Sequence, residues 1–560
     1  MNRKNEKSKF RIWQAWAAVI AILLVTELIA AGIEHAGLIK GQGQAADTGM
    51  TVQAAEETPQ AKDTESGQPR ADSEDPQRQA AQDPPQAEGG KDAPQTKTDQ
   101  KDSEEQAARE STQSTAKNES AQSQSVQESQ KSVEEESGSS RTSAAASLSH
   151  EGYTLNKVVI LSRHNIRSPL SGSGSTLQTM TPHEWHAWSS SPSELSLRGG
   201  VLETEMGQYF RKWFEAEGFF PENYHPGEEE VRIYANSKQR TMATAKYFTA
   251  GLLPTADTWT ETQVEYDQMD PVFTPQFVFM NDAYAKAVTD QVLTLYSEKL
   301  AGLSDNCDLL ARVLDLEDSE AFRSGEVPGF RTDDTALELK ADAEPRMTSS
   351  LKNACSASDA LVLQYYEEPD LDKASFGEGL NHEEWEKISE IKDVYIDTLF
   401  TAPLAAPHLA NPLLEEIQSE LEDPGRRFTF LCGHDSNIAS VTAALSVEDY
   451  QLPDAIEKRT PIGCKIVFSE WRDMDDSSWM SVDLVYQTDE QLRECPLLDL
   501  ENPPAVYPLT LEGLERNADG LYGTDAVMER LYDAIGEFDR IMQEYAPDVW
   551  QQLELEDEAA

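Results

Sequence analysis

Residues 158–169 read VVILSRHNIRSP, a short apolar run followed by a histidine that stands between two arginines. The run at 158–161 has the length and the β-branched composition of a buried strand. A guanidinium group keeps its charge and presents forked donors that match phosphate oxygens, so Arg163 and Arg167 are candidate phosphate-binding residues. His164, which lies between them, is the candidate nucleophile.

Two further stretches repeat this order of apolar run, polar cluster and helical pattern. Residues 231–234 precede a helical segment that carries Arg240, and residues 428–432 run directly into His434 and Asp435. Strands that alternate with helices favour a mainly parallel α/β sheet flanked by helices. Ligands bind beyond the carboxyl ends of such strands, so we expect the three clusters to converge there.

The residue types in these clusters suit the transfer of a phosphoryl group. We expect His164 to attack the phosphorus and Asp435 to protonate the leaving oxygen as a general acid. His434 is expected to donate to a phosphate oxygen, and Arg240 to add a third guanidinium. Three arginines and a histidine supply enough positive field that we expect no metal and no cofactor.

The remaining pattern divides the chain into segments. Residues 151–550 carry nearly all the aromatic residues and are expected to form one domain, in which an α-rich lobe at about 254–424 is inserted. Residues 551–560 form an acidic tail. Further helices are expected at 283–300, 356–367, 382–400 and 524–545, and further strands at 465–468 and 480–486.

The chain has 560 residues and a formal net charge of −54, which argues against nucleic acid as a partner. Residues 41–150 contain no Phe, Trp, Tyr or Cys and few aliphatic residues. Such a segment cannot bury enough apolar surface to offset the entropy of ordering, so we expect a disordered acidic linker.

Residues 1–40 have the pattern of an export signal, because basic residues, among them Lys4, Lys7, Lys9 and Arg11, precede an apolar stretch at 12–33. Both a cleaved signal peptide and an uncleaved signal anchor fit this length. The basic residues place the amino end in the cytoplasm and the enzyme outside it. We therefore expect an extracytoplasmic protein, held at the cell surface by this membrane segment or secreted after cleavage, with a linker that reaches into the cell wall.

The Arg-His-x-x-Arg-x-Pro motif from Arg163 and the His434-Asp435 pair resemble those of the histidine acid phosphatases, a branch of the histidine phosphatase superfamily. Within that family the chain is most similar to the bacterial glucose-1-phosphatases. The resemblance implies a phosphoglycerate-mutase-like α/β core, an α-helical lobe and a two-step phosphohistidine mechanism. The stretches that carry it, besides the two motifs, are 234–245, 269–273, 363–367, 433–440 and 459–463.

The resemblance also implies a substrate class. A glutamate of the lobe gates the pocket in this family, and Glu344 in Ala343-Glu344-Pro345 looks like its counterpart. Asn165 stands where many members, phytases included, have glycine, which favours the glucose-1-phosphatase side. We therefore expect an acid phosphatase for small phosphomonoesters, with glucose 1-phosphate first and inositol phosphates second.

Three other functions were weighed against this one. A broader phytase of the same family differs only in its substrate range. A non-catalytic surface-display protein would require a broken catalytic set, and none is broken in this sequence. A phosphoryl mutase would act on cytoplasmic metabolites, which the export segment disfavours.

Overall fold

The computed structural model describes residues 147–170 and 174–552. The predicted export segment, nearly all of the predicted linker and most of the acidic tail lie outside these residues, so the predicted domain limits remain predictions. Leu148, near the first described residue, is fully buried in an apolar cluster that includes Phe210 and Trp471. Within the described ranges, no helix has both the length and the apolar character needed to cross a membrane.

The predicted strands and helices are confirmed, and several elements are added to them. Their carboxyl ends place the site, so the bounds are given in full. The strands are β1 (Thr154–Arg163), β2 (Val231–Ala235), β3 (Leu337–Glu338), β4 (Arg346–Met347), β5 (Phe428–Gly433), β6 (Lys465–Arg472), β7 (Ser478–Tyr486), β8 (Ala505–Pro508) and β9 (Tyr522–Gly523). The helices are α2 (Thr176–Thr179), α3 (Leu197–Ala216), α4 (Gln239–Leu252), α5 (Asp282–Gly302), α6 (Ser304–Val313), η1 (Leu316–Asp318), α7 (Glu320–Ser324), α8 (Ser350–Glu367), α9 (Leu371–Ala374), α10 (His382–Phe400), α11 (Ala406–Glu422), α12 (Asp435–Ala444), α13 (Asp489–Glu494) and α14 (Thr524–Tyr545).

The main sheet is mixed, and the prediction of a mainly parallel sheet is wrong. Its order is β2-β5-β1-β6-β7-β8, and β9 pairs with β7. Only β1 and β2 run parallel to their common neighbour β5, whereas the pairs β1–β6, β6–β7, β7–β8 and β7–β9 are antiparallel. The cause is local: residues 473–477 between β6 and β7 are too few for a crossover, so these strands form a hairpin.

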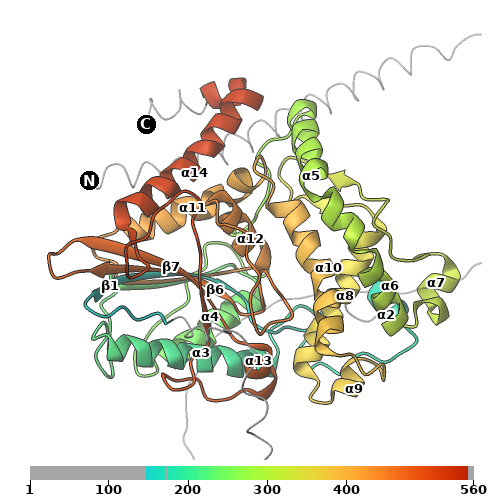
Figure 1. Ribbon diagram of the computed structural model, residues 1–560, viewed down its shortest axis with the longest axis horizontal. Coiled ribbons are helices and arrows are strands. Elements are labelled where there is room, and N and C mark those ends of the chain that lie inside the picture. The colour runs from blue at the N-terminus through green and yellow to red at the C-terminus, as the bar shows by residue number, and fades with distance from the viewer. Residues whose placement is uncertain (1–146, 171–173, 553–560) are drawn as a thin grey trace, which may run out of the picture. The chain divides into compact units, whose positions relative to one another are not determined.

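Helices cover both faces of this sheet (Figure 1). Helices α3 and α4 pack on one face, where Phe248 stacks on Phe430 with ring centroids 4.2 Å apart. Helices α11, α12 and α14 cover the other face, and their apolar side chains share a core with Val159 and Leu431. Burial on both faces explains why β1 and β5 read as unbroken apolar runs.

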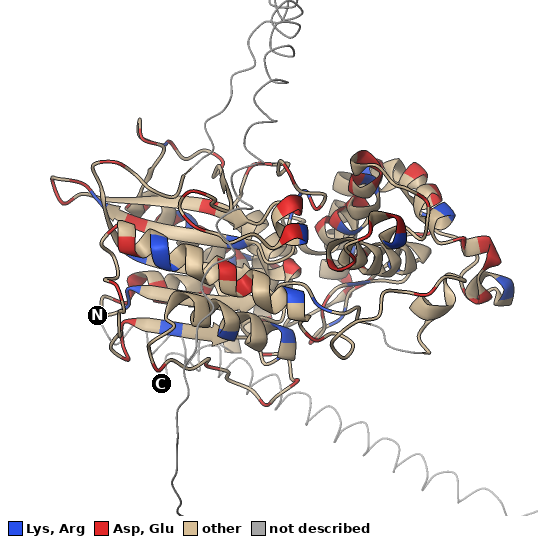
Figure 2. Cartoon of the chain, turned by 90° about the horizontal axis from the view of Figure 1, so that it is seen from below, with Lys and Arg blue, Asp and Glu red and all other residues tan. Residues whose placement is uncertain are grey.

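Helices α5, α6, α8 and α10 lie beside the sheet, and we call this group the lobe (Figure 1). Helices α5, α6, α8 and α10 share a core of their own, to which Leu310, Leu361 and Ile391 contribute. Helix α10 packs against α8 of the lobe and also against α12, which follows β5. Helix α10 therefore brings side chains of the lobe to the carboxyl end of the sheet. Asp and Glu occur on helices of both the lobe and the sheet core (Figure 2).

Candidate active site

The three sequence clusters meet at the carboxyl ends of three adjacent parallel strands. Arg163 at the end of β1 pairs with Gly433 at the end of β5. The backbone continues this alignment, because the His164 N–H donates to the Gly433 carbonyl at 3.0 Å and the Asn236 N–H donates to the Cys432 carbonyl at 3.0 Å. The predicted convergence is confirmed.

His164 is buried and oriented for attack. Its Nδ1 lies 2.9 Å from the backbone oxygen of Asn165, and a carbonyl only accepts, so Nδ1 carries the proton. The lone pair is therefore on Nε2. Burial, with the charges of Arg240 and Arg167, holds the pKa of His164 well below its usual range. These effects favour the neutral imidazole, the form that a nucleophile must have.

Three arginines, Arg163, Arg167 and Arg240, place their positive charges near the His164 ring. Arg163 is fully buried, and its NH1 pairs with Glu457 at 2.7 Å and donates to the Thr460 carbonyl. Arg167 pairs with Asp359 at 3.0 Å. The buried Nε–H groups of Arg163, Arg167 and Arg240 have no hydrogen-bond partner among the described residues. Unsatisfied buried donors of this kind suit an oxyanion.

The positive charge of Arg240 is disfavoured by its surroundings. Burial and the neighbouring Arg167 lower the pKa of Arg240 to about 10, which still leaves the guanidinium charged at neutral pH. Two buried like charges repel each other unless an anion lies between them, so this pair favours the binding of phosphate.

His434 presents one N–H beside Arg240. The amide Nδ2 of Asn236 donates to Nε2 of His434 at 2.7 Å, and Oδ1 of Asn236 is fixed by accepting from the Asp270 N–H at 3.0 Å. Nδ1 of His434 consequently carries the proton. It lies 3.4 Å from a guanidinium nitrogen of Arg240, so two donors lie side by side. The His434 and His164 rings are T-shaped to each other with centroids 5.5 Å apart, so the Nδ1–H of His434 and the Nε2 lone pair of His164 can act on one phosphate.

Asp435 is the first residue of α12, where the helix dipole favours a carboxylate. Its Oδ2 lies 3.0 Å from Nζ of Lys392 and 3.4 Å from a nitrogen of Arg163, while Oδ1 accepts from the Ser436 N–H at 3.0 Å. Burial acts to raise the pKa of Asp435, but the charges of Lys392 and Arg163 outweigh it and hold that pKa well below its usual range. In this state Asp435 is a carboxylate.

Glu344 lies in the loop between β3 and β4, which belongs to the lobe. Burial raises the pKa of Glu344, and the charges of Arg346, Asp435 and Arg240 also act on it. Two of those three groups are candidate site residues, so the charges of the cluster reach Glu344, and its gating role stays a prediction.

Sequence reasoning missed the carboxylates and the lysine that hold the cations in place. Lys392, Asp359 and Glu457 lie in a helix, a second helix and a loop, with no local motif around them. Asn236 was quoted within a motif but had no assigned role. The one signal that could have found them is the rule that a buried cation needs an anionic partner.

A second set of missed residues supports the nucleophile loop from behind. The side chain of Asn165 donates to Glu203 at 2.9 Å, and Glu203 forms an ion pair with Lys465, again at 2.9 Å. Both members of this pair are completely buried. Gly463 closes the arrangement, since a Cβ there would lie 2.6 Å from Asn165 Nδ2.

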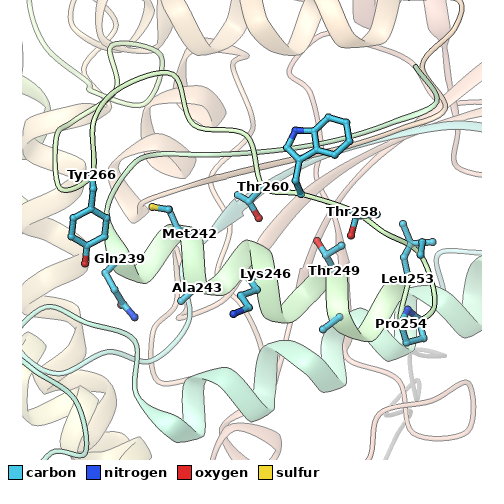
Figure 3. Close-up of a pocket in the computed structure, with 13 residues that line it drawn as sticks. Gln239, Met242, Ala243, Lys246, Thr249, Leu253, Pro254, Thr258, Thr260 and Tyr266 are labelled. Atoms are coloured by element: carbon cyan, nitrogen blue, oxygen red, sulfur yellow. The ribbon is translucent and has the colours of Figure 1, made fainter. Parts of the chain in front are cut away.

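The surface pocket along α4 does not coincide with this cluster. Within the described part of the chain, no group of three His, Cys, Asp or Glu side chains is placed to hold a metal ion. A pocket of about 630 Å³ lies along the outer side of α4, between Gln239 and Pro254 (Figure 3). Its lining includes none of the candidate site residues.

Comparison with known proteins agrees with this geometry. Residues 154–487 match the model of the histidine phosphatase superfamily (branch 2). The chain belongs to this family. It is 35% identical to a glucose-1-phosphatase of Salmonella typhimurium over 379 residues, which cover 67% of this chain and 91% of that protein. A glucose-1-phosphatase of Providencia rettgeri is 36% identical over 374 residues, covering 65% and 88%.

Phytases of the family are more distant in sequence. Phytase AppA of Escherichia coli is 29% identical over 388 residues, covering 66% of this chain and 89% of that protein. The solved structure of a Hafnia alvei phytase in complex with tartrate has a TM-score of 0.63 and 26% identity, covering 69% of this chain and 98% of that one. The protein is thus a phosphomonoester hydrolase of the histidine acid phosphatase type.

Proposed function

We propose that this enzyme hydrolyses small phosphomonoesters, with glucose 1-phosphate as the first candidate, through a phosphohistidine at His164. The observation that carries the proposal is the fixed tautomer of His164. Its Nδ1–H is bound to the Asn165 carbonyl, and the free Nε2 lone pair lies among Arg163, Arg167 and Arg240.

In the first step Nε2 of His164 attacks the phosphorus, and the bond between phosphorus and the ester oxygen breaks. The three guanidinium groups and the Nδ1–H of His434 hold the equatorial oxygens, where negative charge collects. The leaving oxygen takes a proton from Asp435. The products of this step are an alcohol, a phosphohistidine and the Asp435 carboxylate.

In the second step water replaces the alcohol. The Asp435 carboxylate takes a proton from that water as its oxygen attacks the phosphorus, and the bond between phosphorus and Nε2 breaks. Phosphate leaves, His164 is again neutral and Asp435 is again protonated. The protonated acid starts the cycle, so turnover of esters with poor leaving groups is expected to rise as pH falls.

Glu344 is the basis for the proposed substrate preference. If Glu344 gates the site as proposed, its carboxylate repels a substrate that carries several phosphates and tolerates one that carries a neutral sugar. The two glucose-1-phosphatases share more of the sequence with this chain than the phytase does. Phytase activity remains the alternative.

Initial rates on a panel of esters at acidic to neutral pH test this proposal. We expect glucose 1-phosphate to give a higher kcat/KM than inositol hexakisphosphate, and His164→Ala to abolish turnover of both. The reverse order would make the enzyme a phytase, and an active His164→Ala variant would end the nucleophile assignment.

The place of action is a separate proposal. We propose that the enzyme works outside the cytoplasm, held by the apolar segment at 12–33 or released from it, with the linker in contact with the cell wall. The basic residues before that segment support this orientation. Cell fractionation with protease treatment of intact cells tests it: activity confined to the cytosol would contradict it.

A further inference from the structure

Lys392 is a lobe residue that enters the candidate active site. It lies within α10, whose start is fixed by a capping box of Asn381 and Glu384, and it is only 6% exposed. Its Nζ lies 3.0 Å from Asp435 Oδ2, 3.0 Å from Asp359 Oδ1 and 3.6 Å from Glu457 Oε1. An ammonium group is buried at this depth only when anions compensate its lost hydration.

The surroundings of Asp435 come from several parts of the fold. Arg163 and His164 approach from the end of β1, His434 from the end of β5, and Lys392 from α10. Two further charges act on Asp435, those of Arg240 on α4 and of Glu344 in the β3–β4 loop. Asp359 and Glu457 act on it indirectly, because they pair with the same cations as Asp435 does. Lys392 is the nearest cation, since its 3.0 Å ion pair is shorter than the 3.4 Å contact of Arg163.

Lys392 also differs from the arginines in what it touches. Each of Arg163, Arg167 and Arg240 keeps a buried Nε–H with no hydrogen-bond partner in the described part of the chain, whereas the three near contacts of Lys392 are all to carboxylates. The Lys392 ammonium therefore stabilises the carboxylates of Asp435 and of Asp359, and Asp359 in turn pairs with Arg167. Such a residue acts through the acid and does not need to touch phosphate.

We propose that Lys392 is a positioning residue that fixes Asp435 from the side of the lobe and sets the pH at which Asp435 acts as the acid. This inference rests on the proposed function, because Asp435 must be the proton donor for it to apply. Oδ2 is held between Lys392 and Arg163, and Oδ1 is held by the Ser436 N–H. A proton stays on Asp435 only when the negative charge of bound phosphate offsets these cations.

The sign of the effect of removing Lys392 follows from this geometry. A cation at 3.0 Å favours the carboxylate, so its loss raises the pKa of Asp435 in the free enzyme. The kcat/KM profile reports ionisations of the free enzyme. For an ester with a poor leaving group, activity depends on protonated Asp435, so the basic limb moves to higher pH by about 1 unit or more.

The test compares pH profiles of kcat/KM for glucose 1-phosphate in the wild type, Lys392→Met and Lys392→Arg. We expect Lys392→Met to move the basic limb upward and Lys392→Arg to restore its wild-type position. Lys387→Met is the matched control: it lies on the same helix, is 44% exposed and pairs with Glu383, and it should leave the profile unchanged.

Two further variants keep the test decisive. Asp359→Asn removes a carboxylate that competes with Asp435 for Lys392, so the ion pair between Lys392 and Asp435 becomes stronger. The basic limb of the kcat/KM profile should therefore move to lower pH, opposite to the shift in Lys392→Met. This variant serves if Lys392→Met does not fold. In an Asp435→Asn background, Lys392→Met should cause no further shift, and p-nitrophenyl phosphate, whose leaving group needs no proton, should show little dependence on Lys392.

Failure of this inference is distinct from failure of the proposed function. An active wild type whose basic limb stays in place in Lys392→Met, or shifts equally with p-nitrophenyl phosphate, overturns the role of Lys392. A downward shift in Lys392→Met overturns it as well. A wild type that hydrolyses none of the esters overturns the proposed function instead.

Discussion

Replacing Lys465 with methionine should destabilise the enzyme strongly, because it leaves a buried carboxylate without its counter-charge. Lys465 and Glu203 are both 0% exposed and lie 2.9 Å apart. Removing one partner of such a pair costs about 3–5 kcal/mol. The methionine itself should fit, since Nζ of Lys465 already lies 5.5 Å from the ring of Phe248 and 5.8 Å from that of Phe430. The loss therefore reports the orphaned charge and not a steric clash.

The double variant Glu203→Gln/Lys465→Met separates charge from packing. Glutamine keeps an oxygen that accepts from Asn165 Nδ2 and carries no charge, so the double variant should recover most of the lost stability. Urea unfolding followed by intrinsic fluorescence measures the change in the free energy of unfolding. A single variant as stable as the wild type, or a double variant less stable than the single one, would refute the reasoning.

Three further outcomes are expected. Asp435→Asn should slow the hydrolysis of glucose 1-phosphate by about 10²–10⁴-fold and that of p-nitrophenyl phosphate much less. It should also remove the rise of kcat/KM towards low pH, because that rise depends on protonating a carboxylate whose pKa is held low. Equal slowing of both esters would contradict the role of Asp435 as the acid. Glu344→Ala should increase the rate on inositol hexakisphosphate relative to glucose 1-phosphate several-fold, and an unchanged ratio in steady-state assays would remove Glu344 as a gate. Incubation with EDTA should leave initial rates unchanged, whereas a loss that added metal restores would contradict the metal-free mechanism.

Much of the site was readable from the sequence, because each of its three clusters directly follows an apolar run. The runs at 158–161, 231–234 and 428–432 are strands, and neighbouring parallel strands bring their carboxyl ends together. The tautomer of His164 agrees with what its chemistry requires. A nucleophilic imidazole needs its second nitrogen held by an acceptor, and the Asn165 carbonyl supplies it.

Other features were beyond this reasoning for identifiable reasons. Strand direction is not written in an apolar run, and the short 473–477 connection that makes β6 and β7 a hairpin is known only once both strand ends are known. Lys392 approaches Asp435 from 43 positions earlier in the chain, and nothing next to it marks a buried lysine. The Glu203–Lys465 pair likewise joins a helix to a strand, so only tertiary packing identifies it.

The most direct test of the account is to trap the phosphorylated enzyme. The wild type is mixed with radiolabelled glucose 1-phosphate, quenched within milliseconds in base, which preserves phosphohistidine, and digested for peptide mapping. We expect one label, on the peptide that contains His164, and none in His164→Ala. Rapid turnover without a labelled peptide, or a label on another residue in an active His164→Ala variant, would contradict the account.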